Sequence, residues 1–169
     1  MFFKKYDKFD IQIGKPVDEN INKQIDAEPP NDPLNEFDEF EMGLKLFCYE
    51  QNHYVILELG NQRINDLVFH RSVISPLGSG IEKVIAKLES GRKGSVTFGE
   101  TVYGRSKWLE LTPKKDKIIC ELDDSVYTLK YSKCIQKLKT FFIEVLKMAI
   151  AQGYIDLKEA EKEFGWKLS

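Results

Sequence analysis

The sequence predicts an α+β protein built on a curved antiparallel β-sheet of about six to eight strands. Short stretches of alternating apolar and polar residues, separated by turn residues, recur along most of the chain and are typical of antiparallel strands. Helical patterns intervene only near 81–90 and 132–152, whereas a parallel sheet needs a crossover after nearly every strand. We therefore expect a long C-terminal helix and one or two shorter helices to pack on the sheet.

The N-terminal part of the chain predicts one strand followed by a loop. Residues 1–13 favour a strand because apolar and polar side chains alternate from Phe9 to Ile13, and Gly14 and Pro16 are expected to end it. Three prolines within 29–33 then indicate an extended segment rather than a helix.

The middle of the chain predicts a hairpin, a third strand and a helix. Alternating apolar residues at 44–49 and at 54–59 indicate two strands joined by a turn at Gln51 and Asn52, and a third strand is expected around 67–73. Ser79 followed by Glu82 fits a capping box, so a helix is expected to begin there and to end at Gly91.

The remainder predicts a four-stranded meander followed by two helices. Strands are expected at 94–103, 106–112, 117–122 and 125–131, because turn residues separate them. A broad apolar stripe predicts the long helix at 132–152, and a short helix is expected after Asp156. The expected core includes Leu46, Leu57, Leu59, Val96, Ile119, Leu129, Leu138, Phe142, Val145 and Leu146.

Charge is distributed unevenly along the chain. The total net charge is −2, but residues 17–41 contain nine carboxylates and one lysine, so this segment alone carries a charge of −8. We interpret residues 1–41 as an N-terminal strand with an acidic, proline-containing segment, and 42–169 as a single α+β domain. A charged linker is one explanation of the segment, but Phe37 and Phe40 favour attachment to the body or to a partner, because a solvating linker gains nothing from exposed phenylalanines.

These observations favour a non-catalytic protein-binding module whose acidic surface engages a basic protein. The expected partner-binding residues are Glu36, Phe37, Asp38, Glu39, Phe40 and Glu41. The most specific form of the hypothesis is an inhibitor or immunity protein that blocks a cationic toxin by presenting carboxylates where phosphates would bind. We expect the cytoplasm as its location, because three widely spaced cysteines suit a reducing compartment and the N-terminus lacks a secretory apolar run.

Catalysis and nucleic-acid binding are alternatives with weaker support. Cys134 lies near Lys133 and Lys137, which favours a nucleophilic thiol, but no histidine follows it closely as a base. The carboxylates at 110, 121, 123 and 124 lack the spacing of a metal-dependent nuclease, and His53 and His70 lack metal-ligand spacing, so no metal or other cofactor is expected.

The region 92–117 combines lysines and arginines with Trp108, as nucleic-acid surfaces do, although a solvated sheet edge explains the lysines equally well. Nucleic acid is therefore a less favoured partner than a basic protein. No apolar run approaches the roughly 20 residues that span a bilayer, so no membrane partner is expected.

Overall fold

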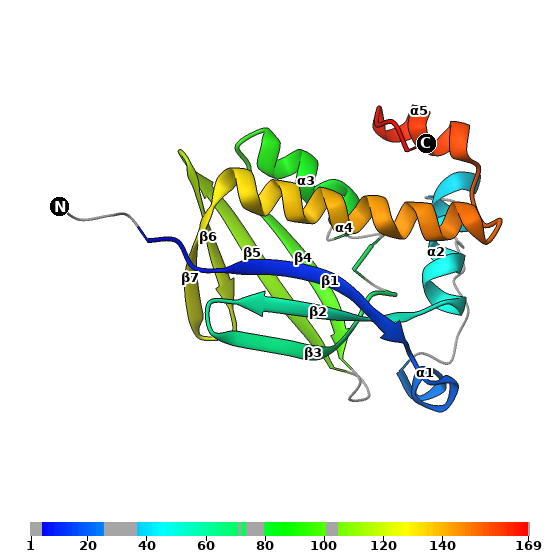
Figure 1. Cartoon of the computed structure of the whole chain (residues 1–169), viewed down its shortest axis with the longest axis horizontal. Coiled ribbons are helices and arrows are strands. Elements are labelled where there is room, and N and C mark those ends of the chain that lie inside the picture. The colour runs from blue at the N-terminus through cyan, green and yellow to red at the C-terminus, as the bar shows by residue number, and fades with distance from the viewer. Residues whose placement is uncertain (1–4, 26–36, 71, 74–79, 101–104, 169) are drawn as a thin grey trace.

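A computed structural model describes residues 5–25, 37–70, 72–73, 80–100 and 105–168. Within these residues, seven strands form one antiparallel sheet in the order β1-β2-β3-β4-β5-β6-β7 (Figure 1). The strands are β1 (Phe9–Pro16), β2 (His53–Leu59), β3 (Gln62–Val68), β4 (Gly94–Glu100), β5 (Ser106–Lys114), β6 (Lys117–Leu122) and β7 (Ser125–Lys130). The helices are α1 (Glu19–Ile25), α2 (Glu39–Glu50), α3 (Ile81–Glu89), α4 (Tyr131–Ala151) and α5 (Leu157–Phe164). The α+β class, the antiparallel sheet and the long helix are confirmed.

The sheet curves so strongly that its two outer strands approach each other at one end. The Asp7 N–H, just before β1, donates to the Thr128 carbonyl of β7 at 2.8 Å, and the Thr128 N–H donates to the Asp7 carboxylate at 2.8 Å. Helix α4 lies along β1 and also contacts β6 and β7, so it fills the concave side of the sheet (Figure 1). Helix α3 packs beside it against β4 and β5.

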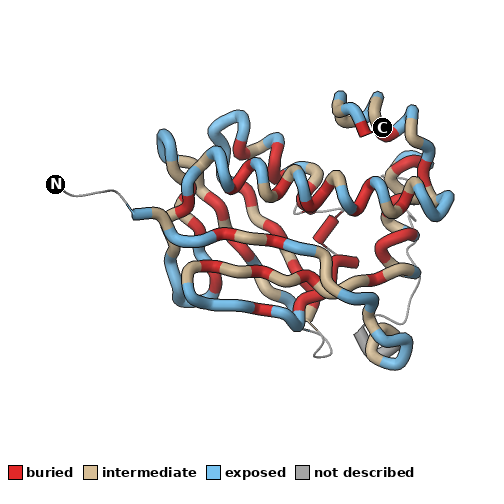
Figure 2. Tube along the Cα trace, viewed as in Figure 1, coloured by how far each residue is buried: buried red, intermediate tan, exposed pale blue. Residues whose placement is uncertain are grey.

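The hydrophobic core lies between the concave face of the sheet and the helices. Figure 2 shows buried positions running along one side of α4 and at alternate positions of the central strands. Eight of the ten predicted core residues are buried: Leu57, Leu59, Val96, Leu129, Leu138, Phe142, Val145 and Leu146. The residues described contain no helix with the length and apolarity required to cross a bilayer.

The predicted strand at 44–49 is wrong, because this segment belongs to helix α2. Asp38 caps the helix by accepting the Glu41 N–H at 2.8 Å, and the buried side chains Phe40, Leu44 and Phe47 recur at helical spacing. Leu46 is 38% exposed, so its assignment to the core is also wrong. Strand β2 pairs instead with β1 and β3.

Other differences are shifts of boundary or register. Strand β1 continues to Pro16 because an irregularity after Ile13 absorbs the change of register, and the third strand ends at Val68 instead of Val73. In β6, Ile118 points into the core and Ile119 does not, so the prediction for Ile119 is wrong by one residue.

Helix α3 has Gly80 at its N-cap position without a side-chain cap, and the predicted cap Ser79 lies outside the described residues. The N-terminal strand is part of the same sheet as the body, and α2 extends across the predicted boundary between residues 41 and 42.

Candidate functional site: an acidic groove between helices

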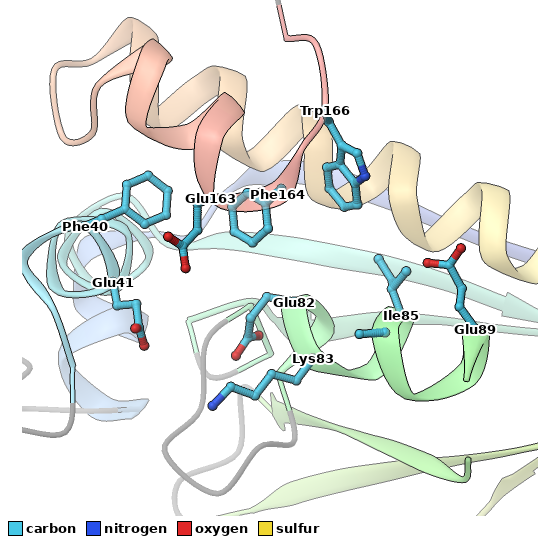
Figure 3. A pocket seen from close by; sticks show the side chains of 10 residues that line it. Phe40, Glu41, Glu82, Lys83, Ile85, Glu89, Glu163, Phe164 and Trp166 are labelled. Carbon is cyan, nitrogen blue, oxygen red and sulfur yellow. The ribbon is translucent and has the colours of Figure 1, made fainter. Parts of the chain in front are cut away.

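A groove of about 360 Å³ lies where α2, α3 and α5 approach one another (Figure 3). We call it the acidic groove. Its aromatic side chains come from α2 and from the region of α5, its base from α3, and its charged side chains from all three helices. The lining residues are Phe40, Glu41, Glu82, Lys83, Ile85, Ala86, Glu89, Glu163, Phe164 and Trp166.

Phe164 is the centre of the aromatic wall. Its ring centroid lies 5.9 Å from that of Phe40, 4.9 Å from that of Phe142 in α4, and 5.5 Å from that of Trp166, on which it stacks. Gly165 ends α5 in a left-handed conformation at φ 69°, which a residue without a side chain adopts at little cost. The turn allows Trp166 to fold back onto Phe164, so the wall joins three helices.

The charged side chains of the groove give it an excess of negative charge. Glu41, Glu82, Glu89 and Glu163 oppose only Lys83 in the lining. The pKa of Glu41 lies above its ordinary value, chiefly because burial disfavours the ionised form, with further contributions from Asp38 and Glu163 and an opposite one from Lys83. Figure 3 shows the Glu41 and Glu163 side chains directed into the space between the helices.

Glu89, at the other end of the groove, is already paired within the protein. Its carboxylate accepts the Lys139 ammonium at 3.2 Å, and the same ammonium lies 5.9 Å from the centre of the Trp166 ring. Glu41 and Glu163 form the opposite end, where Lys83 is the lining residue that offsets part of their negative charge. The arrangement is suited to a cation that also contacts aromatic rings.

The predicted partner-binding residues occupy different environments. Phe40 is 8% exposed, and both Phe40 and Glu41 line the groove. Phe37 packs against the core, with the Lys45 ammonium 5.2 Å from its ring centre. Asp38 is committed to capping α2 and Glu39 is exposed. Glu36 lies outside the described residues.

Eight of the ten residues that line the groove were not predicted to bind a partner. Glu163 and Trp166 belong to the C-terminal region, far from the acidic segment in sequence. The signal available for them was an acidic residue beside two aromatic residues at the end of an amphipathic helix. That signal does not indicate which other helix the aromatic residues contact.

The three cysteines are buried and free, and none is activated. Burial raises the pKa of Cys134 to about 12 and raises the pKa values of Cys48 and Cys120 further, so all three thiols are protonated at neutral pH. The lysines near Cys134 therefore do not make it a nucleophile. It packs as a small apolar side chain in the core.

The histidines have structural partners. His70 is buried, its backbone N–H donates to the Asn52 side-chain oxygen at 3.1 Å, and its ring Nδ1 lies 3.4 Å from the Asn52 side-chain nitrogen. The Nδ1 atom of His53 lies 3.1 Å from the Gly14 carbonyl. Among the residues that the structure describes, no group of three or more histidine, cysteine and carboxylate side chains could hold a metal ion.

The lysines of the region 92–117 are partly balanced by acidic neighbours. Lys93 pairs with Glu110 at 3.2 Å, and Lys107 lies 3.3 Å from Asp123 and 3.8 Å from Glu100. Around Lys93 and Lys107 the region therefore presents mixed charge, and residues 101–104 lie outside the described ranges.

No protein-family model matches the chain, and neither a curated protein nor a solved structure is significantly similar to it.

Proposed function

We propose that this protein is a non-catalytic, cytoplasmic protein-binding module that engages a basic protein through the acidic groove. The observation that carries the proposal is the convergence of Glu41 and Glu163, from opposite ends of the chain, on a wall formed by Phe40, Phe164 and Trp166. The most specific form of the proposal is an inhibitor or immunity protein that blocks a cationic toxin.

An arginine side chain of the partner fits this combination best. Its planar guanidinium group stacks on aromatic rings and donates to carboxylates in a fixed geometry, whereas a lysine ammonium is a compact point charge. Trp166 and Phe164 offer the ring faces and edges, and Glu163 and Glu41 offer the acceptors. The proposal therefore predicts a preference for arginine over lysine at the contacting position.

The electrostatics of the groove also support a cationic ligand. Burial, Asp38 and Glu163 disfavour the ionised form of Glu41 and raise its pKa. A guanidinium between Glu41 and Glu163 offsets the repulsion between them, so the ligand and the ionised form of Glu41 stabilise each other. The surplus negative charge additionally accelerates the encounter with a basic protein at low salt.

The binding proposal is tested with an arginine-rich peptide as the probe. Because the chain contains two tryptophans, a Trp108→Phe background leaves Trp166 as the only tryptophan and its emission as a reporter of the groove. We expect saturable binding that weakens as salt is added, and weaker binding of the matched lysine peptide. Glu163→Gln and Glu41→Gln should each lower the affinity about two- to fivefold.

The control is Glu144→Gln, which removes one exposed carboxylate from α4 outside the groove. It should leave the affinity unchanged. Equal losses for Glu144→Gln and Glu163→Gln would show that the peptide responds only to total charge. Absence of binding at low salt would exclude the acidic groove as a site for a basic partner.

A further inference from the structure

The outer face of strands β5, β6 and β7 carries two bands of like charge. On each of these strands every second side chain points into the core, as Leu111, Cys120 and Leu129 do. The residues between them therefore point outward. Three lysines form the first band, because Lys117 of β6 lies directly opposite Lys114 of β5 and Lys130 of β7. Glu110 and Glu121 lie directly opposite each other and form the second band.

Each band is unfavourable within a single molecule. Like charges at directly opposed positions of neighbouring strands destabilise a sheet, yet both bands consist of such pairs. In the part of the chain that the structure describes, Lys114, Lys117 and Lys130 form no ion pair, and neither does Glu121; Glu110 is paired with Lys93. A surface that brings opposite charges to both bands at once would relieve this repulsion.

A row of one isoleucine and two threonines separates the two bands. Ile119 lies midway between Lys117 and Glu121 on β6, with Thr112 and Thr128 opposite it on the neighbouring strands. Four residues of strand place the two bands about 14 Å apart. Two of the largest exposed apolar side chains flank the acidic band: Trp108 is 53% exposed and Val126 is 64% exposed.

We propose that this outer face is the interface of a homodimer, in which a second copy of the chain packs against it. A two-fold axis that runs across the strands, in the plane of the interface and over Ile119, reverses the direction of each strand in the second copy. It therefore places the lysine band of each copy against the acidic band of the other. Lys117 then faces Glu121 of the second copy in two equivalent contacts, and Ile119 packs on its own counterpart.

The same axis gives Trp108 a partner. Trp108 lies two residues beyond the acidic band, and the symmetry places it against the turn between β5 and β6 of the second copy, which contains the exposed Lys115. An ammonium group over an indole ring is a favourable contact. Antiparallel strands across the interface are also consistent with the aligned packing in which sheets stack about 10 Å apart.

The interface is small, and the dimer is correspondingly weak. The strand spacing and rise give a contact on the order of 1,000 Å² over both copies, at the lower end for a specific association. Because charges face each other across it, the dimer is expected to dissociate as salt is added. This surface is separate from the acidic groove, so the two proposals can fail independently.

Sedimentation velocity over a range of concentrations at low salt tests the interface. The unmodified protein should approach dimer mass at concentrations on the order of 100 μM and return to monomer mass in roughly 0.5 M salt. Lys117→Glu places glutamate against glutamate in both symmetric contacts, and Glu121→Lys places lysine against lysine. Each variant alone should therefore remain monomeric.

Charge exchange distinguishes this geometry from general electrostatic attraction. An equimolar mixture of Lys117→Glu and Glu121→Lys chains should form a heterodimer, because both contacts are then between opposite charges. The chain carrying both changes should form a homodimer again. The matched controls Glu144→Lys and Lys147→Glu, exposed positions on α4, should not change the association.

In a Trp166→Phe background, the emission of Trp108 should shift to shorter wavelength as the dimer forms, and circular dichroism should confirm that each variant is folded. A monomer at every concentration, or a dimer that survives both single reversals, would overturn the proposal. So would two single variants that fail to associate when mixed.

Discussion

The acidic groove and the outer face of β5–β7 both combine carboxylates with aromatic side chains, but they are held in different ways. In the groove, Phe164 contacts Phe40, Trp166 and the buried Phe142, and Trp166 also contacts Phe142, so the aromatic residues form part of the structural core. On the outer face, Trp108 is half exposed and stands on a sheet that backbone hydrogen bonds already maintain.

This difference separates stability from binding in the two regions. A substitution in the groove is expected to alter both the fold and any ligand contact, since the same rings serve both. A substitution on the outer face is expected to alter association while leaving the fold intact. The groove also carries charge of mainly one sign and suits a cationic partner, whereas the outer face carries both signs and suits a second copy of itself.

The largest expected effect is a difference in the free energy of unfolding between substitutions in the two regions. Phe142→Ala removes a fully buried ring that contacts Phe164 and Trp166, so the free energy of unfolding should fall by about 3–5 kcal/mol. Trp108→Ala should cost about 1 kcal/mol or less, because half of that ring is already in water. Urea denaturation of monomeric protein at high salt measures both. Similar losses would contradict the distinction between the regions.

The next effect concerns the close approach of α2 to the chain after α4. A Cβ atom at Gly43 would lie 2.6 Å from the Tyr154 carbonyl oxygen, which is a backbone atom and cannot rotate away. Gly43→Ala should therefore cost about 1–3 kcal/mol, although alanine favours an isolated helix by about 1 kcal/mol. Thermal denaturation monitored by circular dichroism tests this.

Leu46→Ala is the control for Gly43→Ala, since it changes an exposed position on the same helix. It should cost less than about 1 kcal/mol. A stabilising effect of Gly43→Ala would show that α2 and the segment after α4 are not in contact in solution.

How far the sequence predicts this structure is illustrated by α2 and by β6. In α2, the alternation of Leu44, Leu46 and Cys48 has the pattern of a strand. The helical spacing of Phe40, Leu44, Phe47 and Cys48 is the pattern that the structure follows, and it begins inside the acidic segment. The bounds of β6 were predicted correctly, yet two adjacent isoleucines made its inward face ambiguous until the pairing with β5 fixed it.

The acidic groove was predicted only in part, for a different reason. Phe40 and Glu41 were selected from local charge and aromatic content, which the sequence displays directly. Glu163 and Trp166 join them only because α5 packs across α4 and because Gly165 turns the chain back. Contacts between distant segments of this kind depend on the packing of whole helices, and local patterns do not contain them.

A smaller effect on stability distinguishes two neighbouring residues of the acidic segment, Asp38 and Glu39. Asp38 caps α2, so Asp38→Ala should lower the free energy of unfolding by about 1 kcal/mol. Glu39→Ala, at the next and exposed position, should change it by no more than about 0.5 kcal/mol. Chemical denaturation measures the free energy of unfolding of both variants. Equal losses would indicate that general charge near the helix start, rather than the cap itself, stabilises α2.

The smallest effect is a pH dependence that belongs to the groove. Because the pKa of Glu41 in the folded protein lies above its ordinary value of 4.5, the folded state binds this proton more tightly than the unfolded state does. The ionised carboxylate therefore reduces stability at neutral pH, and this penalty disappears as the pH falls below about 4.5. Glu41→Gln should raise the free energy of unfolding at pH 7 by no more than about 0.5 kcal/mol, since the site is partly solvated.

Two neighbouring substitutions determine whether the groove causes the shift in the pKa of Glu41. Glu163→Gln removes a nearby negative charge and should lower the pKa of Glu41, whereas Lys83→Gln removes a positive charge and should raise it. NMR titration of the Glu41 side chain measures the pKa in each variant. Opposite movements would place both charges next to Glu41 in solution, as the groove requires. If both variants left the pKa unchanged, Glu41 would be shielded from α3 and α5 by water, and the acidic groove would not act as a single electrostatic unit.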